Sequence, residues 1–383
     1  MAASTTRVFG PPKLRRQAAF WTFWMLVFGC ALFTAIDQAG YLATYPGAWL
    51  LSVALLAATA IPAGIIIYRF DQFETEPGSM IAIALVWGGV VAVTFSGIVN
   101  TLTYGFLQHV MTASTVEHWA ASLAAPINEE LYKGAGLVLL YLMARREFDG
   151  VMDGLVYGAM IGLGFQVMEN VQYFMLAAAG SDGAAEAVTS MFFLRVVLSG
   201  LYSHMLFTAF FGFGFAYFVT QRGKSLERRI AVLIASVVLA WASHFVWNTP
   251  WLESLMTRGT GTFVAVLVIK GLPFLILLAM LGIFANRRER QVFGCLMRSE
   301  VGGEAVSKGE FYVLQSGRRR RQALQHMRRS KGTEARRIFK RLMREQINLA
   351  LLRSRVPAGD HPALQAQRDL IKRLKAQLAL TST

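Results

Sequence analysis

The sequence predicts an all-α, polytopic membrane protein: a bundle of about eight transmembrane helices followed by a basic helical cytoplasmic tail. The chain of 383 residues is 55% hydrophobic and only 16% charged, with a mean hydropathy of +0.44, which excludes an ordinary soluble globular protein. It carries repeated apolar runs of the ~20 residues that a helix needs to cross a bilayer. Its excess positive charge is confined to the segment from Asn286 onward, which has 23 Lys and Arg against 8 Asp and Glu.

The first predicted span begins at Phe20. A basic N-terminus precedes it, as in a signal peptide, but Trp21, Phe23 and Trp24 are bulky and no small-residue cleavage site precedes the next polar loop, so the span is expected to be retained. The other seven runs are long enough to cross with some tilt: 48–68, 80–107, 119–143, 151–178, 189–219, 229–249 and 262–285. The predicted division is therefore a cytoplasmic N-terminus (1–19), a transmembrane domain (20–285) and a basic cytoplasmic tail (286–383).

The distribution of Lys and Arg among the loops predicts the orientation. Arg69, the Arg145–Arg146 pair and the loop from Arg222 to Arg229 are basic, whereas the loops 37–47, 108–118 and 179–188 contain no Lys or Arg. Both termini are therefore expected in the cytoplasm, which agrees with an even number of spans.

The tail is expected to be helical. Apolar residues recur at helical spacing between Leu324 and Leu352 and again between Leu364 and Leu378, and Pro357, Gly359 and Pro362 separate the two stretches. A basic face next to the membrane favours anionic lipid headgroups as its partner, with a protein partner next and nucleic acid unlikely.

Ionisable residues inside the predicted spans are functional candidates, because placing them in hydrocarbon is costly. The acidic and histidine residues of the fourth to seventh spans lie about 10 to 20 Å from the outer ends of their spans, at ~1.5 Å rise per residue. They therefore form one layer in the outer half of the membrane. The ionisable residues within the predicted spans are Glu129, Glu130, Lys133, Glu169, Arg195, His204, His244 and Lys270.

Two hydrolytic mechanisms require these residue types. A carboxylate beside water can act as a general base or acid, with Lys133 keeping a neighbouring carboxylate ionised. Two His and one Glu from different helices can instead hold a zinc ion that keeps a fourth position open for water. The usual HExxH helix signature is absent, and both mechanisms stay open.

Structural roles compete with these functional ones. Glu129 and Lys133 stand four residues apart and can simply neutralise each other, and a lone His in a membrane helix is commonly an interhelical hydrogen-bond donor. Tyr173, four residues after Glu169, and Asn248, four residues after His244, are each more often structural than catalytic when taken singly. The functional interpretation therefore depends on the shared depth.

The segments that carry these residues resemble motifs of the PrsW family of intramembrane proteases. The stretch Ala125–Lys133 looks like that family's EExxK motif, and Glu147–Phe165, leading into the sequence ENVQYF at Glu169–Phe174, is similar to its glycine-rich helix with an ENxxYF ending. His204, and His244 with Asn248, fill two later motifs, and the loop Asp71–Pro77 is similar to an acidic EP loop. The resemblance covers about residues 65–250 and does not extend to the tail.

The resemblance implies a membrane-embedded peptidase that is distantly similar to the type II CAAX prenyl endopeptidases. The founding activity of the family is cleavage of a membrane-bound anti-sigma factor on its extracytoplasmic side. Glu129 and Glu130 would bind or activate water, with Glu130 preferred as the base, and Glu169 would be a second acid or a ligand.

The resemblance also implies roles for the remaining candidates. His204 and His244, with Glu169 as the third ligand, would hold zinc; without metal, the two rings would donate to the oxyanion. Lys133, Tyr173 and Asn248 would orient the residues that do the chemistry. The glycines of the fifth span would allow helices to approach closely; they are Gly158, Gly162 and Gly164.

The sequence is therefore interpreted as a peptide-bond hydrolase of the bacterial cytoplasmic (inner) membrane that acts on a membrane protein, in the simplest case a single-pass one. The predicted cofactor is zinc, or none if a glutamate activates the water. The alternatives are a proton-coupled transporter, which would predict inverted repeats that the sequence does not show, and a non-catalytic scaffold that acts through the tail.

Overall fold

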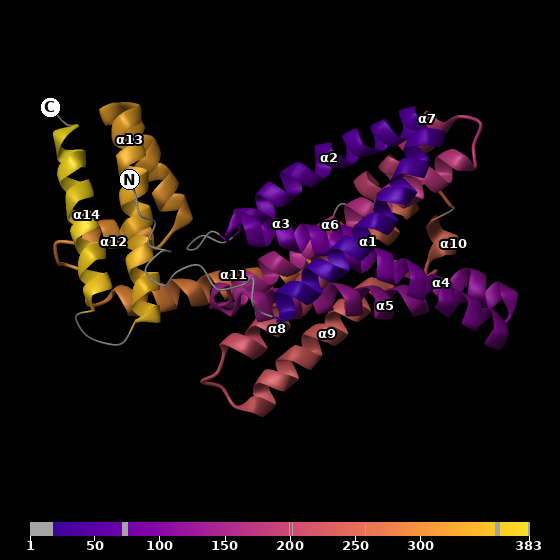
Figure 1. Cartoon of the computed structure of the whole chain (residues 1–383), viewed down its shortest axis with the longest axis horizontal. Coiled ribbons are helices and arrows are strands. Elements are labelled where there is room, and N and C mark those ends of the chain that lie inside the picture. The colour runs from indigo at the N-terminus through magenta and orange to yellow at the C-terminus, as the bar shows by residue number, and fades with distance from the viewer. Residues whose placement is uncertain are drawn as a thin grey trace. The chain divides into compact units, whose positions relative to one another are not determined.

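The computed structural model of the chain is helical throughout the residues it describes, which are 18–70, 76–198, 200, 202–256, 258–356 and 361–381 (Figure 1). These residues contain no β-strand, and an isolated bridge joins Val301 to Val306. The predicted all-α fold is confirmed. The basic N-terminus and residues 71–75 of the predicted acidic loop lie outside the described residues.

Seven of the eight predicted spans coincide with helical stretches that are long and apolar enough to cross a membrane. Two of these stretches contain a π-helical segment: η3 (Trp87–Ala92) lies between α3 (Gly78–Val86) and α4 (Val93–Val110), and η5 (Phe192–Leu198) follows α7 (Ala184–Met191). The other helices in these stretches are α1 (Ala18–Thr44), α2 (Pro46–Tyr68), α6 (Val151–Ala179), α8 (Ser203–Thr220), α9 (Leu226–Asn248) and α11 (Thr260–Met297).

The remaining predicted span, the fourth in chain order (119–143), coincides with α5 (Ala113–Met143), which is long enough to cross but less apolar. It carries Glu129, Glu130 and Lys133, and all three side chains are buried. Charged residues in such a helix must face protein rather than lipid. Two short helices, η4 (Arg145–Glu147) and α10 (Glu253–Met256), lie in the connections.

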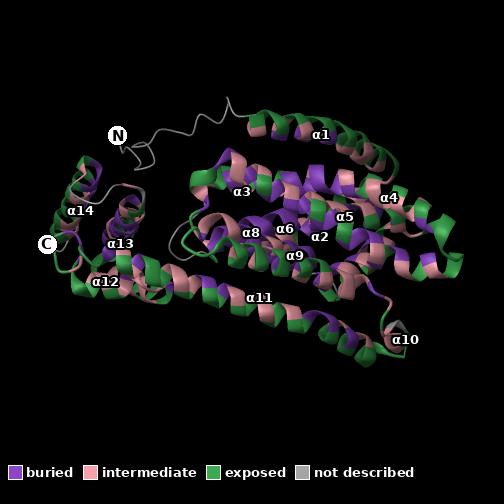
Figure 2. Ribbon diagram, turned by 90° about the horizontal axis from the view of Figure 1, so that it is seen from below, coloured by how far each residue is buried: buried purple, intermediate pink, exposed green. Residues whose placement is uncertain are grey.

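Helix α6 is the most enclosed element of this bundle and packs against α8, α2 and η3 (Figure 2). Its first turn is capped by Asp153, whose Oδ2 accepts hydrogen bonds from the backbone N–H groups of Asp149 (2.7 Å) and Gly150 (2.8 Å). Asp153, the third residue of the helix, thus satisfies backbone donors that precede the first turn, as in a capping box.

Glycines set the spacing between α6 and its neighbours. A Cβ atom at Gly158 would collide with the backbone oxygen of Thr208, and one at Gly162 with the backbone oxygen of His204. On another face of α6, a Cβ at Gly164 would collide with the backbone oxygen of Leu85. The predicted close approach at these three glycines is confirmed, and it brings the start of α8, which carries His204, directly against α6.

We expect Gly162→Val to lower the free energy of unfolding by about 1 to 3 kcal/mol, because the added side chain overpacks the seam between α6 and α8. Since the seam also places His204, activity should fall further than stability. Thermal unfolding in detergent and peptide cleavage would be measured side by side. The control is Gly97→Val, because a Cβ at Gly97 meets no atom within 4 Å. Equal losses of stability and activity in the two variants would contradict the view that the contact between α6 and α8 positions His204.

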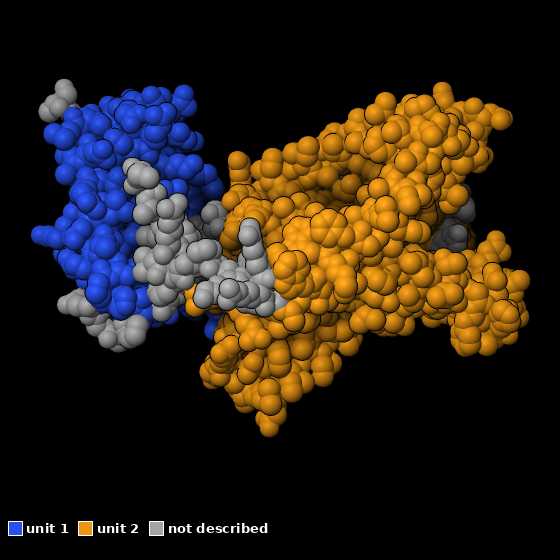
Figure 3. Space-filling model, viewed as in Figure 1, with its two compact units in different colours: residues 1–12, 72–75, 286–383 blue, residues 13–71, 76–285 orange. Residues whose placement is uncertain are grey.

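The tail forms a separate compact unit, which comprises the described residues from Asn286 onward (Figure 3). It contains α12 (Lys308–Leu314), α13 (Gly317–Arg355) and α14 (Pro362–Leu380). Gly332 interrupts α13 with a φ of 86°, a conformation that favours glycine. The unit has its own apolar core, whose buried members include Val306, Leu314, Leu342, Leu349, Leu364, Ile371 and Leu374.

Candidate active site

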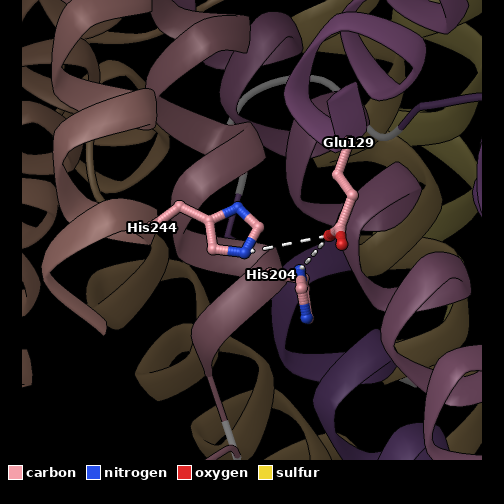
Figure 4. A group of neighbouring side chains, drawn as sticks. All are labelled: Glu129, His204 and His244. Carbon is pink, nitrogen blue, oxygen red and sulfur yellow. Dashed lines mark ion pairs between the residues drawn. The ribbon is translucent and has the colours of Figure 1, made fainter. Parts of the chain in front are cut away.

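The acidic and imidazole residues of the spans, together with Lys133, meet at one place between α5, α6, α8 and α9. At its centre, Glu129 of α5 faces His204 of α8 and His244 of α9 (Figure 4). One oxygen or nitrogen atom of each residue lies within 4.8 Å of the others, and all three side chains are buried. This is a donor set of the kind that can hold a metal ion or activate a water molecule.

Glu129 has one oxygen committed and one available. Its Oε1 accepts a hydrogen bond from Asn100 Nδ2 of α4 (3.3 Å). Its Oε2 is buried and accepts no hydrogen bond from any described residue. Three nitrogens surround Oε2 at longer range: Lys133 Nζ (3.5 Å), His204 Nδ1 (3.8 Å) and His244 Nε2 (3.8 Å). A buried acceptor without a donor is costly, so Oε2 is the atom prepared to bind something.

Each histidine is held by a second carboxylate on the nitrogen that faces away from Glu129. His204 Nε2 lies 3.0 Å from Glu169 Oε2, and His244 Nδ1 lies 3.1 Å from Glu130 Oε1. A ring that donates its N–H to a carboxylate presents the lone pair of its other nitrogen. Both rings therefore aim a lone pair at the space beside Glu129, in the arrangement that second carboxylates give to metal-binding histidines.

Aromatic rings fix the planes of both imidazoles. The ring of Phe207 stacks on His244 with centroids 4.6 Å apart, and Phe165 lies 5.0 Å from His204. These apolar contacts also exclude water from the far sides of the rings.

Glu130 and Lys133 form a buried ion pair with Nζ to Oε1 at 2.6 Å. Glu130 accepts a further hydrogen bond from Thr208 Oγ1 (3.2 Å), so with His244 it is engaged by three donors. Lys133 Nζ also lies 3.1 Å from His204 Nδ1. The ammonium of Lys133 is thus a cation that lies between Glu130 and His204.

Glu169 is held from the other side by Arg195 of η5. Arg195 donates to Glu169 Oε2 (3.2 Å) and to Asn170 Oδ1 (3.1 Å), and its guanidinium lies 3.6 Å from the centroid of the Tyr173 ring. Tyr173 therefore supports Arg195 rather than touching the histidines. π-helical turns such as η5 are frequent at functional sites.

Two of the polar residues singled out from the sequence lie outside this group. Asn248 Nδ2 contacts the backbone oxygen of Ala121 at 3.4 Å, so its side chain ties α9 to α5. Lys270 Nζ donates to the backbone oxygen of Thr249, just after α9 ends. The orienting role expected for Asn248 stays a prediction.

Neutral residues of the site were missed by sequence reasoning. Asn128 Nδ2 donates to Asn100 Oδ1 (3.0 Å) and to Thr103 Oγ1 (3.1 Å), and Asn100 in turn donates to Glu129. Thr208 was missed in the same way. Two features of the sequence could have indicated them: Asn100 stands within an apolar run, and Asn128 stands next to the glutamate pair.

We expect Asn100→Ala to lower kcat about tenfold with little change in KM, because the lost hydrogen bond fixes the carboxylate of Glu129, which the sequence predicts to bind or activate water, and is worth roughly 1.5 kcal/mol. Steady-state cleavage of a peptide substrate would measure both constants. Thr101→Ala, an exposed residue of the same helix whose hydroxyl bonds only to Gly97 O, is the matched control. A loss of the same size in that variant would contradict a specific role for Asn100.

Comparison with known proteins gives a consistent family match. A family model described as PrsW family intramembrane metalloprotease matches residues 76–278, just over half of the chain and a range that contains the whole site. Protease PrsW of Geobacillus kaustophilus (strain HTA426) is 28% identical over 188 residues, which are 48% of this chain and 72% of that protein. Protease PrsW of Bacillus subtilis (strain 168) is 27% identical over 180 residues, 46% of this chain and 72% of that protein. No solved structure matches.

Proposed function

This chain belongs to the PrsW family of intramembrane metalloproteases and is a membrane protease, and we propose that Glu129, His204 and His244 form its active site. The observation that carries the proposal is the buried Glu129 Oε2, which lacks a hydrogen bond and faces two histidine nitrogens inside a helical membrane domain. The reaction is hydrolysis of a peptide bond in a membrane protein.

Glu129 is the carboxylate that contacts the attacking water. Its Oε2 is available, whereas Glu130 is engaged by Lys133, His244 and Thr208. Oε2 takes a proton as the water oxygen attacks the carbonyl carbon, and the protonated acid returns it to the leaving amine as the C–N bond breaks. Glu130 and Glu169 keep the two imidazoles in place during both steps.

The same residues fit a zinc ion. Glu129 Oε2, His204 Nδ1 and His244 Nε2 would hold it, because two imidazole lone pairs and one carboxylate are a usual catalytic zinc set. When bound, zinc supplies a Lewis acid that lowers the pKa of water. The ammonium of Lys133 supports this fit, since it lies within 3.1 to 3.5 Å of two of these three atoms, as a cation would.

The site is proposed to open toward the extracytoplasmic side. The connections between α5 and α6 and between α8 and α9 are the basic ones and are assigned to the cytoplasm. Counted along each helix from those ends, Glu129, Glu169, His204 and His244 lie roughly 21 to 27 Å inward at 1.5 Å per residue. In a hydrocarbon core about 30 Å thick, that is the outer half.

This orientation and the family membership support a proposed location and substrate. We place the protein in the cytoplasmic membrane of a bacterium with both termini inside. Its substrate would be a membrane protein with a cleavable segment near the outer surface, and an anti-sigma factor is the substrate class that the resemblance implies.

Comparison of membrane-protein N-termini by mass spectrometry tests the function. Cells would carry the unmodified protein, Glu129→Gln, or Glu117→Gln as an exposed control on the same helix. New protein N-termini at the extracytoplasmic border of the cytoplasmic membrane are expected with the unmodified protein and with Glu117→Gln. Identical termini in all three, at equal protein levels, would contradict proteolysis and favour the carrier or scaffold functions.

A further inference from the structure

The charges of the tail are segregated between two parts of its fold. Glu300 accepts hydrogen bonds from Arg353 and Arg368, and burial, which would raise the pKa of Glu300, is outweighed by these two guanidinium groups, so that its pKa is held below the usual range. Lys372 pairs with Glu304, and Lys375 pairs with Glu310 at 2.7 Å. These three acidic residues are therefore engaged by Arg353 near the end of α13 and by α14.

The rest of α13 is almost entirely cationic. From Gly317 to Arg344 the helix contains twelve Lys and Arg and one acidic residue, Glu334, which pairs with Arg337. Ten of the basic side chains are exposed: Arg318, Arg321, Arg328, Arg329, Lys331, Arg336, Arg337, Lys340, Arg341 and Arg344. We call these ten residues the basic face.

The basic face is opposed by buried residues of the same helix. After Gly332, at 100° per residue, Arg336, Lys340 and Arg344 lie on one side, whereas Leu342 and Leu349 lie on the other and are buried in the core of the tail. The apolar side is thus already used in folding. A helix of this kind cannot insert into a bilayer, but it can lie against a charged surface through its basic side.

We propose that the basic face binds the anionic headgroups of the bilayer in which the protease resides. The tail continues the last apolar helix, because Asn286–Met297 at the end of α11 already belong to the tail unit, so the chain itself keeps the tail near a membrane surface. Each Lys or Arg close to an anionic leaflet strengthens binding about fivefold. Single-stranded nucleic acid is less suited, because the exposed residues from Arg318 to Arg344 include no Phe, Tyr or Trp and a single His, His326, on which bases could stack.

The test uses the full-length protein in lipid nanodiscs, so that the tail stays attached. The proteolytically inactive Glu129→Gln form serves as background, and the result is therefore independent of the proposed function. A dye is attached through Gln325→Cys, at an exposed position, in a Cys295→Ser background, and quenching of the dye by headgroup-labelled lipid reports proximity. Nanodiscs contain phosphatidylcholine alone or with phosphatidylglycerol.

We expect strong quenching only with phosphatidylglycerol, and its loss at high salt. Arg328→Gln/Arg336→Gln should lower the ratio of bound to free tail by about 30-fold. The matched control Lys308→Gln/Arg373→Gln removes two exposed charges outside the basic face and should keep the quenching.

Equal quenching in the two lipids, or equal effects of the two double variants, would overturn the proposal. So would a signal that responds to added RNA or to a cytosolic protein but not to phosphatidylglycerol.

Discussion

Glu129→Gln is expected to reduce kcat/KM by at least about 10³-fold while the protein stays folded. The substitution keeps the shape of the side chain and its contact with Asn100 but removes the proton acceptor or ligand at Oε2, and general acid–base groups contribute ~10² to 10⁴-fold. Oε2 accepts no hydrogen bond from the described residues, and its ion pair with Lys133 (3.5 Å) is longer than the one between Glu130 and Lys133 (2.6 Å), so less native stabilisation is lost than on substitution of Glu130. Cleavage kinetics and thermal unfolding in detergent measure the two effects.

The neighbouring glutamate provides the contrast. Glu130→Gln removes the nearer of the two carboxylate partners of the fully buried Lys133, and breaking a buried ion pair costs roughly 3 to 5 kcal/mol, so this variant should lose stability as well as activity. Activity of Glu129→Gln within tenfold of the unmodified enzyme, or a stability loss as large as that of Glu130→Gln, would contradict the assignment of Glu129.

The ionisable members of the site could be found from the sequence because charge is rare and costly inside apolar helices. Glu129, Glu130, Glu169, His204 and His244 stand out for that reason, and all of them lie in the group that the structure brings together. The same charges explain why α5 is the predicted span that is not counted among the apolar ones.

The pairing within the site could not be predicted. The sequence favoured Glu169 with the two histidines as metal ligands, whereas the structure places Glu129 with them and uses Glu169 to hold the far nitrogen of His204. Residue spacing identifies the face of one helix but not how α6 and α8 are rotated against each other. That rotation is set by backbone contacts at Gly158 and Gly162.

Neutral positioning residues are hidden for a related reason. Asn100, Asn128 and Thr208 cost little in a membrane helix, so the positions of the two Asn residues in the sequence are weak signals that ordinary interhelical hydrogen-bonding residues share. Their role follows only from distances of 3.0 to 3.3 Å to one another or to the glutamates.

Lys133→Met is expected to raise the affinity for zinc by about 100-fold or more. The ammonium of Lys133 lies 3.1 Å from His204 Nδ1 and 3.5 Å from Glu129 Oε2, so it competes with a metal cation for the same two atoms. Two charges about 4 Å apart interact by roughly 4 kcal/mol in a medium of effective dielectric constant near 20, and a divalent ion is repelled more strongly. Met keeps the apolar stem in its buried place.

Zinc content after dialysis, measured by elemental mass spectrometry together with cleavage, decides between the two ways in which Glu129 can act. Tighter zinc binding with cleavage retained, and loss of both in His204→Ala and His244→Ala, means that the three residues hold the ion and that Lys133 occupies its place when no ion is bound. A Lys133→Met protein that is folded, binds no zinc and does not cleave means that the ammonium is the cation that the carboxylates require, and that Glu129 acts on water directly.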